Sequence, residues 1–199
     1  MSDSKLILYP IDPIWCFEPT ELANMLASIG LLGQAFLQKK EARNSHFYYA
    51  GENFLQLIEF VSSHFVRHLE IVDGELVETQ ISDSKNSCYI SLELYQEPSF
   101  LGSALTQTPF CTNCRYVIED WTNLVSDWYS GKENYVWHCP QCQTVSAIYA
   151  LDWNKRNGFA KCSIDIWDIW LDEARPSKKL LIDLKRITDK EWTFLYYRI

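Results

Sequence analysis

The sequence contains none of the motifs that define the common nucleotide-binding and hydrolase families. It has no glycine-rich phosphate loop, no Gly-x-Ser-x-Gly elbow and no dinucleotide-binding fingerprint. His64 and His68 lie four residues apart and would share one face of a helix, but the glutamate that follows the first histidine of the zinc-protease motif is missing. The two residues are therefore either a second metal site or ordinary surface or core histidines.

Glycine, proline and long apolar runs are also scarce. Seven of the 199 residues are glycine and seven are proline, whereas 47% are hydrophobic, which is the composition of a folded chain. The longest apolar candidate, residues 22–37, is interrupted by polar residues and is shorter than the roughly 20 apolar residues of a membrane-spanning helix. The first residues lack the pattern of an export signal. We therefore expect a soluble, cytoplasmic protein with no membrane contact.

Cysteine, in contrast, is well represented, with seven residues. In a cytosolic chain these thiols are expected to be reduced. Cys16, Cys88 and Cys162 lie among apolar neighbours, and we interpret them as small core residues, with a reactive thiol as the alternative. The remaining four occur in two Cys-x-x-Cys pairs, FCTNCRY and WHCPQCQ, with 24 residues between the inner cysteines.

This spacing predicts a metal site with four thiolate ligands, Cys111, Cys114, Cys139 and Cys142. Two residues between the cysteines of a pair let both sulfurs turn toward one ion, and the intervening segment can form a hairpin that brings the pairs together. Residues 110–143 resemble a zinc ribbon. Four thiolates leave no open coordination position, so we expect a structural Zn²⁺, with iron as the other candidate ion. The CPQC pair by itself would also suit a redox switch.

Charge separates the possible partners. The chain carries a net charge of −8, of which residues 1–109 contribute −8, residues 110–143 contribute −2 and residues 144–199 contribute +2. A ribbon that binds phosphates should be basic, so nucleic-acid binding is disfavoured. The remaining route to nucleic acid is a basic cluster on the last predicted helix and at a predicted hairpin tip. Its members are Lys178, Lys179, Lys185 and Arg186 on the helix, with Lys155 and Arg156 at the tip.

Aromatic residues and aspartates supply the other candidate sites. Trp121, Trp128 and Trp137 lie between the cysteine pairs, and we expect them to pack in a core or against a protein rather than stack on bases. Asp165, Asp168 and Asp172 would suit a hard metal or acid–base chemistry. Along a strand, however, Asp165 and Asp168 would face opposite sides, since they differ by an odd number of positions.

The N-terminal part reads as mixed helix and strand. KLILY is a predicted strand, Pro19 begins a helix that ends near Gly30, and residues 31–38 return as a strand. HFYYAG, a helix over 52–65, an Asp73-Gly74 hairpin and the strand CYISLELY follow. Residues 96–109, rich in Pro, Ser and Thr, are predicted to connect this part to the cysteines.

The C-terminal part repeats this outline. TVSAIYALDW and FAKCSIDIWDIWL are predicted to form a hairpin around Asn157-Gly158, Pro176-Ser177 begins a helix, and EWTFLYYRI is a closing strand. The fold class is therefore α+β, with split β-α-β units in a ferredoxin-like plan around one sheet and an inserted four-cysteine zinc ribbon. The expected parts are 1–105, the ribbon 106–144, and 145–199 packing on the first.

YYAGENFLQLIEF, the ribbon, RPSKKLL and WTFLYY together resemble a group of uncharacterised bacterial proteins. The resemblance implies a bacterial cytosolic origin and brings no activity. We expect a non-catalytic, zinc-binding protein that binds another protein, as an inhibitor, an immunity protein or an accessory subunit. The alternatives are a metal-containing hydrolase or transferase with acidic residues in a cleft, and a nucleic-acid binder that uses the basic last helix.

Overall fold

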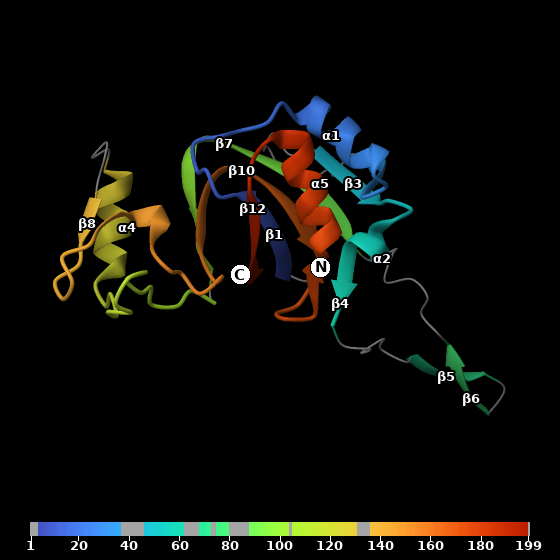
Figure 1. The fold of residues 1–199 in the computed structure, drawn as a ribbon. Coiled ribbons are helices and arrows are strands. Elements are labelled where there is room, and N and C mark those ends of the chain that lie inside the picture. The colour runs from blue at the N-terminus through green and yellow to red at the C-terminus, as the bar shows by residue number, and fades with distance from the viewer. Residues whose placement is uncertain are drawn as a thin grey trace.

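The computed structural model describes residues 4–36, 46–61, 68–72, 75–79, 88–103, 105–130 and 136–198. Its centre is a six-stranded antiparallel sheet with the order β12-β1-β10-β7-β3-β2 (Figure 1). These strands are β1 (Ser4–Pro10), β2 (Leu32–Phe36), β3 (His46–Ala50), β7 (Tyr89–Leu101), β10 (Gly158–Trp167) and β12 (Trp192–Arg198). The mixed α+β class predicted from the sequence is confirmed.

In the described part of the chain, three two-stranded pairs lie outside this sheet. They are β4 (Ile58–Phe60) with β11 (Ala174–Pro176), β5 (His68–Val72) with β6 (Glu75–Thr79), and β8 (Val136–His138) with β9 (Val145–Ala147). Val72 is opposite Glu75, which is the register of the hairpin predicted from Asp73-Gly74; the turn itself lies outside the described residues.

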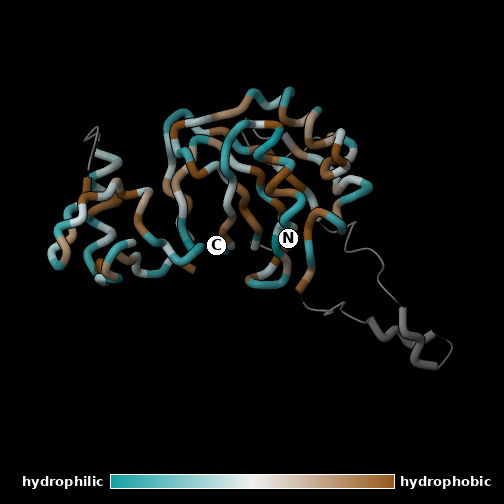
Figure 2. The backbone as a smooth tube through the Cα atoms, viewed as in Figure 1, coloured by the Kyte–Doolittle hydropathy of each residue, from teal (hydrophilic) through white to brown (hydrophobic). Residues whose placement is uncertain are grey.

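Two helices, α1 (Pro19–Ser28) and α5 (Lys178–Thr188), lie together over the sheet (Figure 1). Alternation along β1 explains the packing: Leu6 and Leu8 belong to the same buried cluster as Leu26 and Leu184 of the helices, whereas Ile7 belongs to a separate cluster. Figure 2 shows the resulting pattern, in which hydrophobic stretches of strand and helix alternate with hydrophilic turns.

Helix α1 begins and ends, and α5 begins, as their sequences predict. The Glu18 carboxylate accepts the Glu21 N–H before α1, and Gly30, with φ 76°, follows its end. Ser177 caps α5 by accepting the Leu180 N–H at 3.1 Å, and Asp189 ends it in a left-handed conformation. Among the described residues, no helix is long and apolar enough to cross a membrane.

The ferredoxin-like plan is not confirmed. Strands β10 and β12, joined by α5, do flank β1, as a split β-α-β unit requires. The first unit does not follow this rule, because β2 lies at the far edge of the sheet with β10, β7 and β3 between it and β1. The sheet therefore has a wider order than the local repeat suggested.

The helix predicted over 52–65 is wrong in length. Helix α2 (Phe54–Leu57) is only four residues long, and the chain becomes extended at Ile58 to form β4. Ile58 is fully buried while Glu59 is exposed and pairs with Arg175 at 3.1 Å, so pairing with β11 overrides the helical pattern.

Two predictions around the cysteine segment are also wrong. Residues 96–101 continue β7 instead of forming a connection, and Leu101 is opposite Gly158 of β10. The predicted hairpin around Asn157-Gly158 does not form, because β10 pairs with β7 and β9 pairs with β8. Asn154 and Lys155 both have left-handed backbones, with φ 53° and 54°. They turn the chain into β10, which does not pair with the preceding strand β9.

The segment between β7 and β10 has a hydrophobic cluster of its own. It contains helix α4 (Trp121–Tyr129), which was not predicted, and the short helix η1 (Ile148–Ala150). Phe100 and Phe159 are opposite each other on β7 and β10, with ring centroids 5.2 Å apart. Phe159 belongs to this cluster and Phe100 packs against it, so the two rings join the cluster to the sheet. Trp121 and Trp128 pack against these two rings, which confirms the packing interpretation of the tryptophans.

Candidate metal centre

The four cysteines of the two pairs converge on one point. Their sulfur atoms all lie within 4.8 Å of one another. The sulfurs of Cys111 and Cys142 are 3.7 Å apart, and those of Cys114 and Cys139 are 3.5 Å apart. A tetrahedral ion with metal–sulfur bonds of about 2.3 Å requires sulfurs about 3.8 Å apart. The cluster therefore fits one four-coordinate metal ion.

The two pairs have the same local backbone. In the first, the Cys111 N–H donates to the carbonyl of Tyr116 at 2.9 Å and the Arg115 N–H donates to that of Cys111 at 3.0 Å. In the second, Cys139 donates to Thr144 at 2.9 Å and Gln143 donates to Cys139 at 3.0 Å. Each pair therefore forms a knuckle, a tight turn that places two sulfurs on one side.

The residue after the second cysteine of each knuckle has a left-handed backbone. Arg115 has φ 64° and Gln143 has φ 61°. A side chain in this region costs roughly 1 kcal/mol or more, and neither residue is a glycine. Among the described residues of 110–143, these two positions that close the knuckles are the ones with a left-handed backbone, which points to a site that imposes the turn.

Short antiparallel pairings support both knuckles. Phe110 bridges Val117 across the first knuckle and also bridges Asp152, while β8 and β9 flank the second. Arg115 forms an ion pair with Asp152 and lies over the Phe110 ring at 4.6 Å, which fastens the first knuckle to the segment that precedes β10.

The thiols differ in their affinity for protons. The hydroxyl and backbone N–H of Thr144 lower the pKa of Cys142 to about 5, and this hydroxyl lies 3.2 Å from the Cys142 sulfur. Burial raises the pKa of Cys114 to about 12, and hydrogen bonds with the other three sulfurs act in the same direction. A bound cation would allow all four to be thiolates at neutral pH, because it offsets their mutual repulsion.

Among the described residues, this is the one cluster of three or more potential metal ligands. His64 lies outside the described residues. His68 begins strand β5 and is therefore not part of the helix on which the two histidines were predicted to share a face. Of the three other cysteines, Cys88 and Cys162 are buried and Cys16 is half-buried. Burial raises the pKa of Cys162, as expected for an unreactive core thiol.

The three aspartates do not converge. Asp165 is fully buried on β10, where Lys5 of β1 donates to it at 2.5 Å and the Ser163 hydroxyl at 2.6 Å. Asp168 lies just beyond the strand with φ 63°, and Asp172 is exposed, 3.8 Å from Arg156. Burial raises the pKa of Asp165, and the charge of Lys5 opposes this. Lys5 was not predicted as a partner, because 160 residues separate the two.

Three of the four cations of the basic cluster on α5 are paired with acids of the same chain. Asp183 lies 3.1 Å from both Lys179 and Arg186, which hold its pKa below the usual range. Lys185 pairs with Glu191. A surface that neutralises its own cations has fewer of them available for phosphates.

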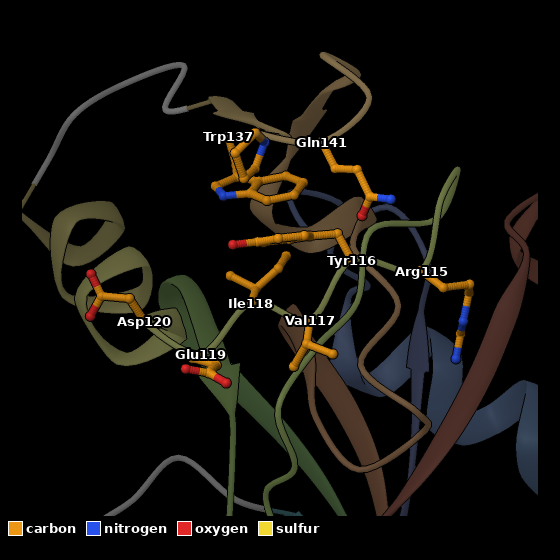
Figure 3. Close-up of a pocket in the computed structure, with 9 residues that line it drawn as sticks. Arg115, Tyr116, Val117, Ile118, Glu119, Asp120, Trp137 and Gln141 are labelled. Atoms are coloured by element: carbon orange, nitrogen blue, oxygen red, sulfur yellow. The ribbon is translucent and has the colours of Figure 1, made fainter.

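An open groove lies beside the knuckles, with a volume of about 620 Å³. Figure 3 shows the rings of Trp137 and Tyr116 lying nearly parallel, with Ile118 beneath them. The ring centroids are 6.4 Å apart with an interplanar angle of 28°. Glu119 and Asp120 lie at one end of the groove, and the Arg115 side chain points away from it (Figure 3). No local sequence pattern indicates this groove, because Tyr116 and Trp137 are far apart in the chain.

Comparison with protein-family models, with curated proteins and with solved structures found no match. The resemblance to uncharacterised bacterial proteins therefore has no support beyond the sequence pieces that suggested it. The four-cysteine cluster rests on the geometry of this chain alone.

Proposed function

We propose that this chain is a non-catalytic protein that binds another protein and is stabilised by one structural Zn²⁺ on Cys111, Cys114, Cys139 and Cys142. The observation that carries the proposal is the convergence of four sulfurs within 4.8 Å, two of them buried. Four thiolates fill a tetrahedral ion, so it has no position for substrate or water. Zinc is favoured over iron because paired Cys-x-x-Cys knuckles are typical of structural zinc sites.

Exposed apolar residues around the ribbon support an interaction role. Fourteen large hydrophobic side chains are exposed among the described residues, and six lie within residues 110–150, about a fifth of the chain. They are Tyr116, Val117, Tyr129, Val136, Val145 and Tyr149. Apolar residues gathered on a small, rigid module are typical of a protein-binding surface.

Charge favours a basic protein as the partner. Residues 1–109 contribute −8 and the ribbon −2, and a zinc ion with four thiolates would add about −2 more. An inhibitor, an immunity protein against a basic toxin or an accessory subunit would each use such a surface. A bacterial, cytoplasmic setting is part of this proposal.

Native mass spectrometry of the untagged protein, enriched from its host cytosol under reducing conditions, tests the proposal. We expect a mass excess of one zinc ion and a stoichiometric complex with a second protein. A zinc-loaded chain that never carries a second protein would contradict the interaction role and would direct attention to substrate screening. A chain without metal would contradict the structural site.

A further inference from the structure

We infer that the groove beside the knuckles binds a basic segment of a protein partner, with the aliphatic part of one arginine or lysine side chain packed along Tyr116 and Val117 and its charged end directed at Glu119 and Asp120. The inference rests on the proposed interaction function and names where, and through which chemistry, a partner docks. It is carried by the shape of the groove, its aromatic wall and its charge.

The aromatic wall is rigid and partly open. Trp137 is 9% exposed and Ile118 is 3% exposed, so both are held by the ribbon's own cluster. Tyr116, stacked on Trp137, is 38% exposed and Val117 is 42% exposed. Because Trp137 and Ile118 lie on the two sides of the Tyr116 ring, an incoming side chain meets the ring edge and Val117, on which an aliphatic stem can pack. The groove therefore offers an aromatic surface to an incoming side chain.

The charge at the groove is negative. Glu119 and Asp120 are both exposed, and within the described part of the chain no cation forms an ion pair with either. Asp120 accepts a hydrogen bond from Asn123 at 2.6 Å, which fixes its carboxylate. Arg115 also lines the groove, but its guanidinium is held by Asp152 and the Phe110 ring.

The occupant must therefore be cationic and able to lie along an open groove. A phosphate or an acidic segment would meet Glu119, Asp120 and the negative charge of a zinc–thiolate cluster. A volume of about 620 Å³ exceeds one side chain, so residues on either side would contact the rim formed by Val117, Pro140 and Gln141. Arginine suits the site best, because its planar guanidinium can pair with a carboxylate through two hydrogen bonds.

Peptide titration of the full, zinc-loaded chain tests this inference. The probe is acetyl-AVRVA-amide, compared with AVQVA and AVEVA peptides, and binding is followed by amide chemical shifts in NMR. We expect AVRVA to shift the signals of residues 116–120 and Trp137, and added salt to weaken the effect. The Glu119→Gln/Asp120→Asn double variant should bind about fivefold or more weakly, while Glu52→Gln, an exposed acid on the sheet body, should bind as the wild type does.

The double variant must still bind one zinc ion and keep the wild-type amide signals of Tyr116 and Trp137. This control distinguishes lost peptide binding from lost folding of the ribbon. Equal binding of AVQVA, wild-type affinity in the double variant, or shifts confined to other surfaces would overturn the inference. A native protein complex that forms undiminished with the double variant would also overturn it while leaving the proposed function intact. Peptide binding at the groove without any cytosolic complex would instead contradict the proposed function alone.

Discussion

At the scale of single residues, the knuckles depend on two backbone positions as well as on four sulfurs. Arg115 and Gln143 adopt left-handed conformations that β-branched residues enter only at a substantial cost. The cysteine spacing was visible in the sequence. The left-handed positions were not, because neither is a glycine or an asparagine, the usual signals for such a turn.

This yields a prediction for Gln143, whose side chain is exposed. Gln143→Val should destabilise the ribbon by about 1–3 kcal/mol, because valine disfavours φ 61°. Gln143→Gly, the matched control, should change stability by less than about 1 kcal/mol, because glycine enters this region freely. Zinc competition with a chelator and thermal unfolding measure both variants. Equal stability of the two variants would contradict a left-handed backbone at position 143.

The buried pair of Lys5 and Asp165 is the second residue-scale feature. Removing one partner of a buried ion pair leaves an uncompensated charge, so Lys5→Met should cost about 3–5 kcal/mol in the free energy of unfolding. Lys178→Met, at an exposed lysine, should cost less than about 0.5 kcal/mol. Denaturant unfolding measures both.

The pH dependence of this variant has a defined sign. Burial raises the folded-state pKa of Asp165, and loss of Lys5 removes the charge that opposes the rise. The folded state then binds the proton more tightly than the unfolded state, so stability falls as pH rises above the unfolded value of about 3.9. Lys5→Met should therefore regain stability on acidification. The window begins near the unfolded pKa of about 3.9. If the stability lost in Lys5→Met is the same at about pH 4 and about pH 7, the Asp165 charge is not the cause of the loss.

At the scale of elements, the ribbon is joined to the sheet through Phe100 and Phe159 on adjacent strands. Structural zinc contributes about 10–16 kcal/mol in small zinc peptides, and the hydrophobic cluster of the ribbon includes two of the ligands, Cys111 and Cys139. The metal should therefore decide whether the ribbon folds, while the sheet, with its own cluster under α1 and α5, folds without it.

Hydrogen exchange of Cys111→Ser tests this separation. We expect amides of 110–150 to lose protection, with fraying that reaches Phe100 and Phe159 but not Leu8 in the centre of the sheet. Cys16→Ser, outside the ribbon, serves as the matched control and should keep the ribbon protected. Loss of protection throughout the sheet in Cys111→Ser would show that the two parts fold as one cooperative unit.

The elements that the sequence predicted well are those with strong local signals. Pro19 and Ser177 mark the starts of α1 and α5, and KLILY and WTFLYY are short apolar runs typical of strands. Helix α4 was missed because its polar Thr, Asn and Ser residues conceal a stripe of Leu124, Val125 and Trp128. The sheet order was missed because the pairings of β7 with β10 and β3 join distant segments, which no local pattern reports.

At the scale of the whole molecule, the sheet body and the ribbon form two distinct parts. The sheet and its helices form an acidic body, and the ribbon, inserted between β7 and β10, extends from one side of it (Figure 1). Three of the four cations of α5 pair with neighbouring acids, so the negative charge dominates the approach of a partner. A rigid, metal-stabilised module with exposed apolar residues is suited to present one surface to that partner.

The central claim is that four thiolates hold one zinc ion, and X-ray absorption at the metal edge tests it most directly. The account predicts one zinc per chain, with four sulfur neighbours at about 2.3 Å and no nitrogen or oxygen in the coordination shell. An iron edge, a shell that includes nitrogen or oxygen, or a protein that binds no metal under reducing conditions would contradict it.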